Sequence, residues 1–115
     1  YQINDVLTAM EADSGIAMTA LKVDGGACAN NYLMQTMADI SSLPVKRPCC
    51  VETTALGAAY LAGLAVGYWK STEDVLQNWA VDHKFTPAIT EEERAARLKG
   101  WNKAVRCSYG WAKEE

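Results

Sequence analysis

The chain has 115 residues, half of them hydrophobic, which is long enough for one domain with a hydrophobic core. Its formal net charge of −3, and the lack of any cluster of Lys and Arg interleaved with aromatic residues, argue against nucleic acid as the main partner. Its four cysteines form no Cys-x-x-Cys pair, and a single histidine without ligand spacing argues against a zinc site. We therefore expect reduced thiols and a cytoplasmic location.

The first segments predict a helix followed by a strand. Residues 1–13 predict an amphipathic helix, because apolar side chains recur at the spacing i, i+3, i+4, i+7. These side chains are Ile3, Val6, Leu7 and Met10. Gly15 stands where a helix commonly ends. Residues 19–23 then form a short β-type run that leads into the next feature.

Two adjacent glycines follow this run, and a helix begins shortly after them. Gly25 and Gly26 let the chain take φ > 0 and let a ligand approach bare backbone. A helix that begins at Asn30 or Asn31 favours a phosphate or another anion at its start. Asp24 either caps the turn or holds a ribose hydroxyl or a metal-bound water. The alternative is a tight turn without a ligand, because the third glycine of a dinucleotide fingerprint is missing.

The next segments complete a βαβ unit. The helix that begins at Asn30 or Asn31 runs to about Ser41, and residues 43–47 read as a second short strand. A strand, a crossover helix and a strand at this spacing predict two parallel strands with a right-handed crossover.

An apolar run rich in Ala and Gly spans residues 55–69. It is shorter than the roughly 20 residues that a membrane-spanning helix needs, so we expect a buried helix and no membrane span. Gly57 and Gly63 each cost about 1 kcal/mol relative to alanine in a helix. Glycines are found inside a helix despite this loss of stability where another element or a ligand packs closely against the helix. The run is therefore either one wall of a ligand cleft or plain helix-to-sheet packing.

The last third of the chain predicts a short helix, an edge strand and a long helix. Ser71 opens the short helix at residues 74–79. Residues 81–86 alternate like a half-buried edge strand, with His83 on the apolar face in a structural role. Thr90 begins a capping box for the long helix. The expected buried stripe of that helix consists of Leu98, Trp101, Val105, Tyr109 and Ala112.

Several motifs together resemble the C-terminal end of the family of carbohydrate kinases that includes glycerol, xylulose and gluconate kinases. The resemblance covers essentially the whole chain. The motifs are Val23-Asp24-Gly25-Gly26-Ala27, Asn30-Asn31, Ala38-Asp39-Ile40, Val45-x-Arg47-Pro48 and Glu52-x-Thr54-Ala55-Leu56-Gly57. The run over residues 52–67, with Trp69 just after it, is similar to the glycerol branch of that family.

This resemblance implies an α/β fold of the actin-like, ribonuclease H-like type, built here from the βαβ unit and packed helices. ATP or ADP would bind in a cleft between two domains, and residues 1–115 would be the C-terminal, nucleotide-binding portion of the enzyme. The positions implied to bind nucleotide are Gly25, Gly26, Ala27 and Asn30. Asn30 can offer an amide donor and an acceptor to the adenine edge. Cys28 would serve as a small apolar residue.

The reaction implied is transfer of the γ-phosphoryl group of MgATP to glycerol, which gives glycerol 3-phosphate. The catalytic base, the glycerol contacts and the Mg²⁺ ligands would lie upstream of Tyr1, so we assign no catalytic residue and no metal ligand here and expect the chain alone to be inactive. The alternatives are another sugar or polyol kinase of the same family, or a non-enzymatic actin-like interaction module.

Because the chain starts at Tyr1 inside a helical pattern, we expect a piece of a longer polypeptide whose exposed surfaces favour a homo-oligomer.

Overall fold

The computed structural model describes residues 1–78 and 80–113. The elements in chain order are α1 (Gln2–Ser14), β1 (Leu21–Lys22), the 3-10 turn η1 (Gly26–Ala29), α2 (Asn31–Ser41), β2 (Val45–Pro48), α3 (Thr53–Ala65), α4 (Thr72–Leu76), β3 (Val81–Phe85), α5 (Glu91–Cys107) and the 3-10 turn η2 (Trp111–Lys113). The fold is mixed α/β, as the sequence predicts. The short helix predicted at residues 74–79 is α4, which begins earlier, at Thr72, and already ends at Leu76; Trp79 itself lies outside the described residues.

The described strands form one sheet in the order β1-β2-β3. β1 pairs with β2 in parallel, with Leu21 opposite Val45, and β2 pairs with β3 antiparallel, with Val45 opposite Phe85. The parallel strands joined through α2 confirm the predicted βαβ unit. β3 lies at an edge of the sheet, also as predicted. β1 is shorter than the predicted run, because the ladder bonds reach only from Leu21 N–H to Pro44 O and from Val23 N–H to Lys46 O.

The hydrophobic core lies between α2 and the sheet. Its buried members are Cys28, Met34, Ala38, Val45 and Phe85. Cys28 is therefore a small apolar core residue, as predicted. Asp39 is the buried acidic residue beside this core, and its Oδ1 accepts hydrogen bonds from Gln35 Nε2 and Ala88 N–H, each at 2.8 Å. Such pairing is what a buried carboxylate requires.

The helix ends follow the local sequence signals. Gly15 adopts φ 68° after α1, and its N–H donates to Glu11 O. Ser71 Oγ accepts from Asp74 N–H, and Thr90 Oγ1 accepts from Glu93 N–H at 3.2 Å. The three predicted caps are confirmed, because capping depends on neighbours within one turn of the chain.

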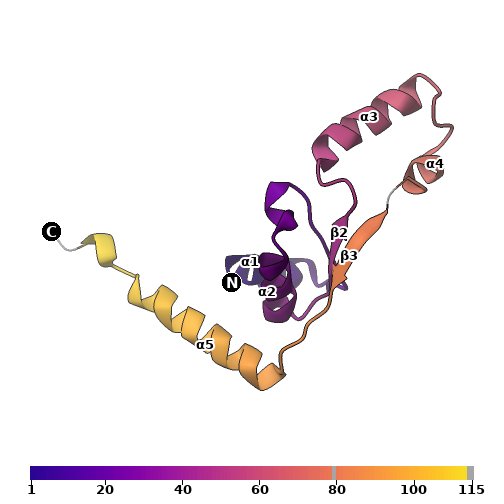
Figure 1. Cartoon of the computed structure of the whole chain (residues 1–115). Helices are drawn as coiled ribbons and strands as arrows, with labels where there is room; N and C mark the ends of the chain where they lie inside the picture. Colours follow the sequence, from indigo (N-terminus) through magenta and orange to yellow (C-terminus); the bar gives the residue numbers. More distant parts are fainter. Residues whose placement is uncertain (79, 114–115) are drawn as a thin grey trace.

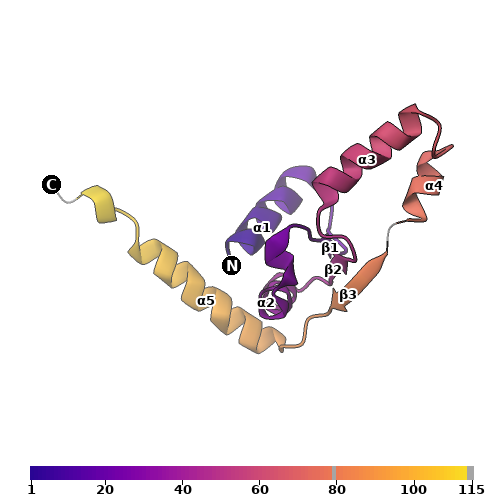
Figure 2. The same cartoon turned by 45° about the horizontal axis from the view of Figure 1, so that its top comes forward.

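The molecule is extended, with two arms that leave the core in different directions (Figures 1 and 2). One arm carries α3 and α4, and the other is α5. The radius of gyration is 18.6 Å, whereas a compact domain of this length has about 13 Å. Much of the surface of both arms therefore lies away from the core.

The apolar run at residues 55–69 is helical only within α3, and it is not the buried helix that the sequence predicts. Gly63 is the buried residue of α3, whereas Leu61 and Val66 are 71% and 82% exposed. The expectation of helix-to-sheet packing is wrong, because α3 projects away from the sheet (Figure 1); the alternative, one wall of a ligand cleft, stays a prediction. The ring of Trp69 occupies the place where a side chain at Gly63 would stand, which explains a glycine inside the helix.

The predicted buried stripe of α5 is also wrong. No residue of α5 is buried, and Leu98, Trp101 and Val105 are only half-buried. Tyr109 and Ala112 are exposed, because the helix ends at Cys107 and Gly110 then takes φ 81°. On this face Trp101 stacks on Tyr1 with ring centroids 5.4 Å apart and donates from Nε1 to Asp5 Oδ2 of α1 at 2.7 Å, and Arg94 donates from Nε to Ile40 O of α2.

β3 is more exposed than the half-buried strand predicted. Phe85 is its buried residue, while His83 and Val81 are exposed. The ring of His83 rests on that of Phe85, with centroids 4.4 Å apart, so its contact is structural as expected. Within the described residues, no helix is long and apolar enough to cross a membrane.

Candidate functional site

The two glycines lie in the turn between β1 and α2, and they have different conformations. Gly25 adopts φ 78° and ψ 169°, which a residue with a Cβ rarely takes. Its N–H donates to Val51 O at 2.8 Å. Gly26 begins η1 and has no positive φ. The expectation of positive φ is therefore confirmed for Gly25 and wrong for Gly26.

The outer side of this turn is open. Gly26, Ala27 and Asn30 are exposed, and Gly25 is half-buried. A Cβ added at Gly26 would meet no other atom within 4 Å, so the glycine there leaves space on the surface. The first N–H groups of a 3-10 turn have no acceptor within that turn. The structure thus places the predicted site residues together on one accessible stretch of backbone.

Asn30 joins η1 to α2 and caps the helix. Its backbone is extended, with φ −79° and ψ 104°, and its Oδ1 accepts from Leu33 N–H at 3.1 Å. This confirms the predicted cap. Asn30 is exposed, and among the described residues no acceptor is hydrogen-bonded to its Nδ2 group.

Asp24 connects the turn to the start of α3. Its Oδ2 accepts a hydrogen bond from Thr53 Oγ1. Together with the Gly25–Val51 bond, this contact ties the glycine turn to the segment that leads into α3. The structure therefore favours turn support among the roles considered for Asp24.

Two hollows border the turn. One of about 350 Å³ is mainly apolar, and its lining includes Ile3, Leu21, Val23, Ala27, Leu33 and Met37. The other, of about 240 Å³, is lined by Lys22, Val23, Asp24, Pro48 and Thr53. The two hollows share Lys22, Val23 and Asp24, the residues that lead into the turn.

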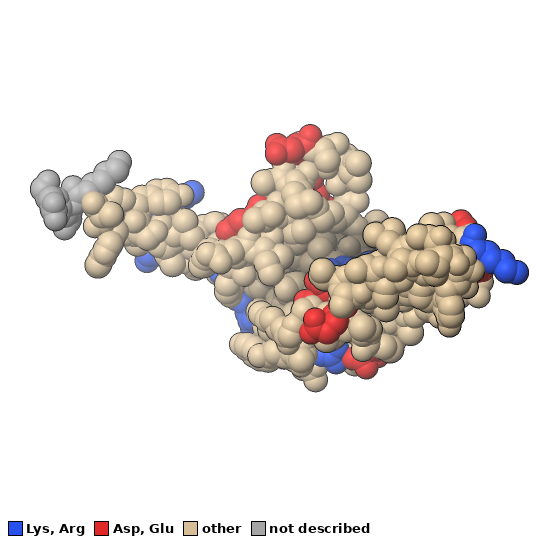
Figure 3. All heavy atoms as spheres, turned by 90° about the horizontal axis from the view of Figure 1, so that it is seen from above, with Lys and Arg blue, Asp and Glu red and all other residues tan. Residues whose placement is uncertain are grey.

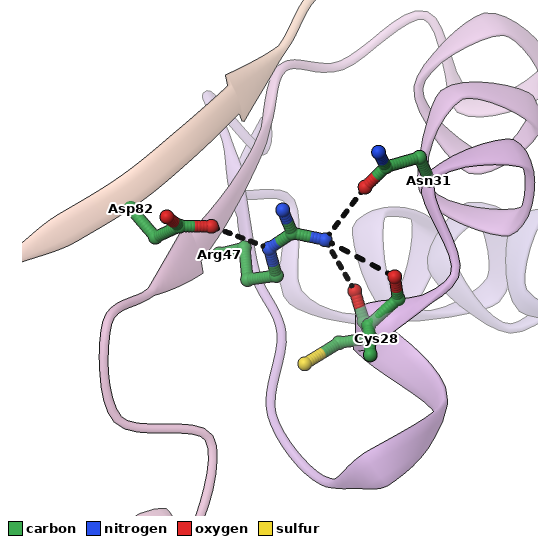
Figure 4. A network of polar contacts seen from close by, with 5 residues as sticks. Cys28, Asn31, Arg47 and Asp82 are labelled. Carbon is green, nitrogen blue, oxygen red and sulfur yellow. Dashed lines mark hydrogen bonds and ion pairs between the residues drawn. The ribbon is translucent and has the colours of Figure 1, made fainter.

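Arg47 is a residue whose role the sequence did not reveal. It comes from β2, yet its guanidinium contacts Cys28 O in η1 and Asn31 Oδ1 at the start of α2 (Figure 4). Only its place in a motif beside Pro48 singled it out in the sequence. The sequence does offer one signal for such a role, namely an arginine within a short strand whose neighbours are buried. A charged group in that position needs hydrogen-bond or ion-pair partners.

Metal-binding groups are not gathered at this turn. Among the described residues, no group of three or more His, Cys, Asp or Glu side chains is arranged to hold a metal ion. The cysteines are free thiols; Cys28 is buried, and Cys49, Cys50 and Cys107 are exposed.

Comparison of this chain with known proteins identifies the family that it matches and several similar relatives. Residues 1–66 match the C-terminal domain of the FGGY family of carbohydrate kinases. The chain is 63% identical over all of its 115 residues to a glycerol kinase of Agathobacter rectalis, of which it covers 23%. It is 60% identical over 114 residues to a glycerol kinase of Caldanaerobacter subterraneus, of which it again covers 23%. The chain therefore spans about a quarter of the length of these relatives.

Solved structures agree with this placement. Plasmodium falciparum glycerol kinase with ADP superposes with a TM-score of 0.79 at 33% identity, over 94% of this chain and 22% of that one. A ligand-bound xylulose kinase of Lactobacillus acidophilus superposes with a TM-score of 0.67 at 21% identity, over 84% of this chain and 19% of that one, which shows a shared fold. The fold is thus that of the C-terminal region of these sugar kinases. With a family match over more than half of its length and relatives this similar over all of it, the chain belongs to the FGGY family of carbohydrate kinases.

Proposed function

We propose that residues 1–115 are the C-terminal, nucleotide-binding portion of a glycerol kinase. The whole enzyme transfers the γ-phosphoryl group of MgATP to glycerol and gives glycerol 3-phosphate. The observation that carries this proposal is the Gly25-to-Asn30 turn, with Gly26, Ala27 and Asn30 exposed, in a chain that is 63% identical to a glycerol kinase over all of its residues. The ADP in the name of the superposed Plasmodium falciparum structure supports the choice of nucleotide.

In this proposal the turn binds ATP or ADP through Gly25, Gly26, Ala27 and Asn30. The glycines let the nucleotide approach the backbone, and the Asn30 amide donates to the base. Mg²⁺ arrives with ATP, which supplies the phosphoryl group, and the ion takes its protein ligands from outside this chain. The base that accepts the glycerol proton also lies outside it. The residues present therefore hold and orient the nucleotide only.

The choice of glycerol over related substrates is tested with the full-length protein. Assays with glycerol, xylulose and gluconate under the same conditions are expected to show turnover of glycerol far above the other two. Preferred turnover of xylulose or gluconate would assign the protein to another branch of the family. Absence of phosphoryl transfer to all three would favour a non-enzymatic interaction module.

Replacement of Asn30 tests the nucleotide contact. In the full-length protein, Asn30→Ala is expected to raise KM for ATP by about 3- to 10-fold, which corresponds to one hydrogen bond, and to leave KM for glycerol unchanged. Asn30→Ser separates the two roles of the residue, because serine caps a helix as well as asparagine but lacks the amide. We expect Asn30→Ser to raise KM for ATP without a change in melting temperature.

Thr90→Ala is the matched control, because it removes the equivalent cap of α5 at a distance from the turn. It is expected to cost about 1 kcal/mol of stability and to leave KM for ATP unchanged. An unchanged KM for ATP in both Asn30 variants would refute the nucleotide assignment.

We propose further that the protein works in the cytoplasm and that the isolated 115-residue chain self-associates. The α3–α4 arm has a broad uncharged surface, on the right in Figure 3. Its exposed apolar side chains include Leu61, Val66, Tyr68 and Leu76. A monomer tolerates only a few hundred Å² of such contiguous surface, and a second copy of the chain covers it most simply.

Light scattering of the isolated chain is expected to show a dimer or a larger species. A matched pair of variants locates the contact: Leu61→Glu should dissociate it, whereas Val6→Glu on α1, also exposed, should not. A stable monomer at high concentration would contradict this prediction.

A further inference from the structure

Arg47 connects the sheet to the turn that carries Asn30. From β2 its Nη1 donates to Cys28 O at 3.0 Å and to Asn31 Oδ1 at 2.8 Å (Figure 4). Ala29 O lies 3.5 Å from the same nitrogen and is at most a weak third acceptor. One guanidinium nitrogen therefore holds the end of η1 and the start of α2 together.

The two acceptors lie on either side of Asn30 in the sequence. Asn30 is the extended residue between two helical segments, so its side-chain direction depends on how those segments are joined. Its own hydrogen bonds are short-range: its N–H donates to Ala27 O, its O accepts from Met34 N–H and its Oδ1 accepts from Leu33 N–H. Arg47 supplies the long-range link, which sets where this junction lies relative to the sheet.

Arg47 is itself held in place. Its Nε donates to Asp82 Oδ2 at 2.8 Å, and its guanidinium lies 5.3 Å from the centroid of the Phe85 ring. The side chain is 14% exposed, although Asp82 is half exposed. The cation–π contact and the ion pair with β3 fix the rotamer. Lysine does not reproduce this arrangement, because Arg47 serves Asp82 and the turn from two separate nitrogens of a planar group, whereas lysine has one ammonium.

We propose that Arg47 is a positioning residue for nucleotide binding: by holding Cys28 and Asn31, it fixes the direction in which Asn30 presents its amide. The inference rests on the proposed function, because it takes Asn30 as a nucleotide contact. Arg47 itself touches no ligand in this scheme. Removal of Arg47 therefore leaves Asn30 and the turn backbone present in the protein, but their orientation is held less firmly.

Arg94 provides a matched control. Its Nε donates to the main-chain Ile40 O at 2.8 Å near the other end of α2, its Nη1 pairs with Glu91, and its side chain is 23% exposed. Arg47→Ala and Arg94→Ala thus each remove a partly buried guanidinium that binds a carbonyl of this region and a carboxylate. The two variants differ in position: Arg47→Ala removes the contacts at the start of α2, and Arg94→Ala removes the contact near its end.

Steady-state kinetics of the full-length protein provide the first test. Arg47→Ala is expected to raise KM for ATP about 10-fold with KM for glycerol unchanged, and Arg47→Lys is expected to recover less than half of that loss. Arg94→Ala is expected to lower the melting temperature about as much as Arg47→Ala does, and to leave both KM values, for ATP and for glycerol, unchanged. Equal KM values for ATP in wild type and Arg47→Ala, or the same rise in Arg94→Ala, would overturn the positioning role.

Amide hydrogen exchange gives a second test that does not depend on activity. In the full-length protein, Arg47→Ala is expected to speed exchange of the Cys28 and Asn30 amides at least 10-fold, and Arg94→Ala is expected to leave them unchanged. Unchanged exchange in Arg47→Ala would overturn the inference even in an active kinase. A wild-type protein that does not use ATP would instead overturn the proposed function, and faster exchange would still show the link between Arg47 and the turn.

Discussion

Gly25→Val is expected to impair the site more than any other single substitution in the glycine turn. Gly25 has φ 78°, and a residue with a Cβ pays about 1–2 kcal/mol for this conformation, more when the side chain is β-branched. Relief of the strain would also move the N–H that donates to Val51 O. We expect KM for ATP in the full-length protein to rise by more than about 10-fold, together with a lower melting temperature.

Gly26→Val separates backbone strain from steric blockage. Gly26 has no positive φ, and a Cβ there meets no protein atom within 4 Å. The variant should therefore keep its melting temperature, while the new side chain stands where the nucleotide is proposed to approach. We expect a higher KM for ATP with normal stability. Unchanged KM values for ATP in both glycine variants would refute the nucleotide-binding role of the turn.

The isolated 115-residue chain is expected to transfer no phosphoryl group to glycerol. It carries the turn that is proposed to hold the nucleotide, but it covers only 23% of the length of a curated relative. Phosphoryl transfer depends on a positioned base and on charge stabilisation around the γ-phosphate, and we propose that both come from the part of the enzyme that this chain does not cover. We therefore expect no ADP formation above background in a coupled assay.

Nucleotide binding by the same chain is expected to be weak, with Kd of about 100 µM or higher. Tight small-molecule sites enclose most of the ligand, whereas this turn is open on its outer side. Titration calorimetry with ADP provides the measurement, and Gly26→Val serves as the control that should abolish the remaining heat. Glycerol phosphorylation by the chain purified from a host that lacks glycerol kinase would contradict the prediction of inactivity.

Local sequence by itself predicted the regular elements and several of their caps, although β1 and α4 are shorter than predicted. The caps at Asn30, Ser71 and Thr90 and the left-handed Gly15 are set by contacts within about one turn of the chain, and the structure confirms each of them. The βαβ unit was equally predictable, because a short crossover helix brings two short strands side by side in parallel. The candidate turn was found for the same reason, since its residues are adjacent in the chain.

Tertiary structure alone decided which surfaces are buried and which distant residues meet. An apolar helix predicts burial only if another layer covers it, and neither α3 nor α5 has such a layer in this chain. Gly25, which takes positive φ, donates its N–H to Val51 O, a partner that the local sequence does not indicate. Arg47 and Asp82 are separated by 35 positions and meet only because β2 and β3 pair. Long-range pairing of this kind leaves no periodic signal in the sequence, because it depends on the register of strands that are far apart along the chain.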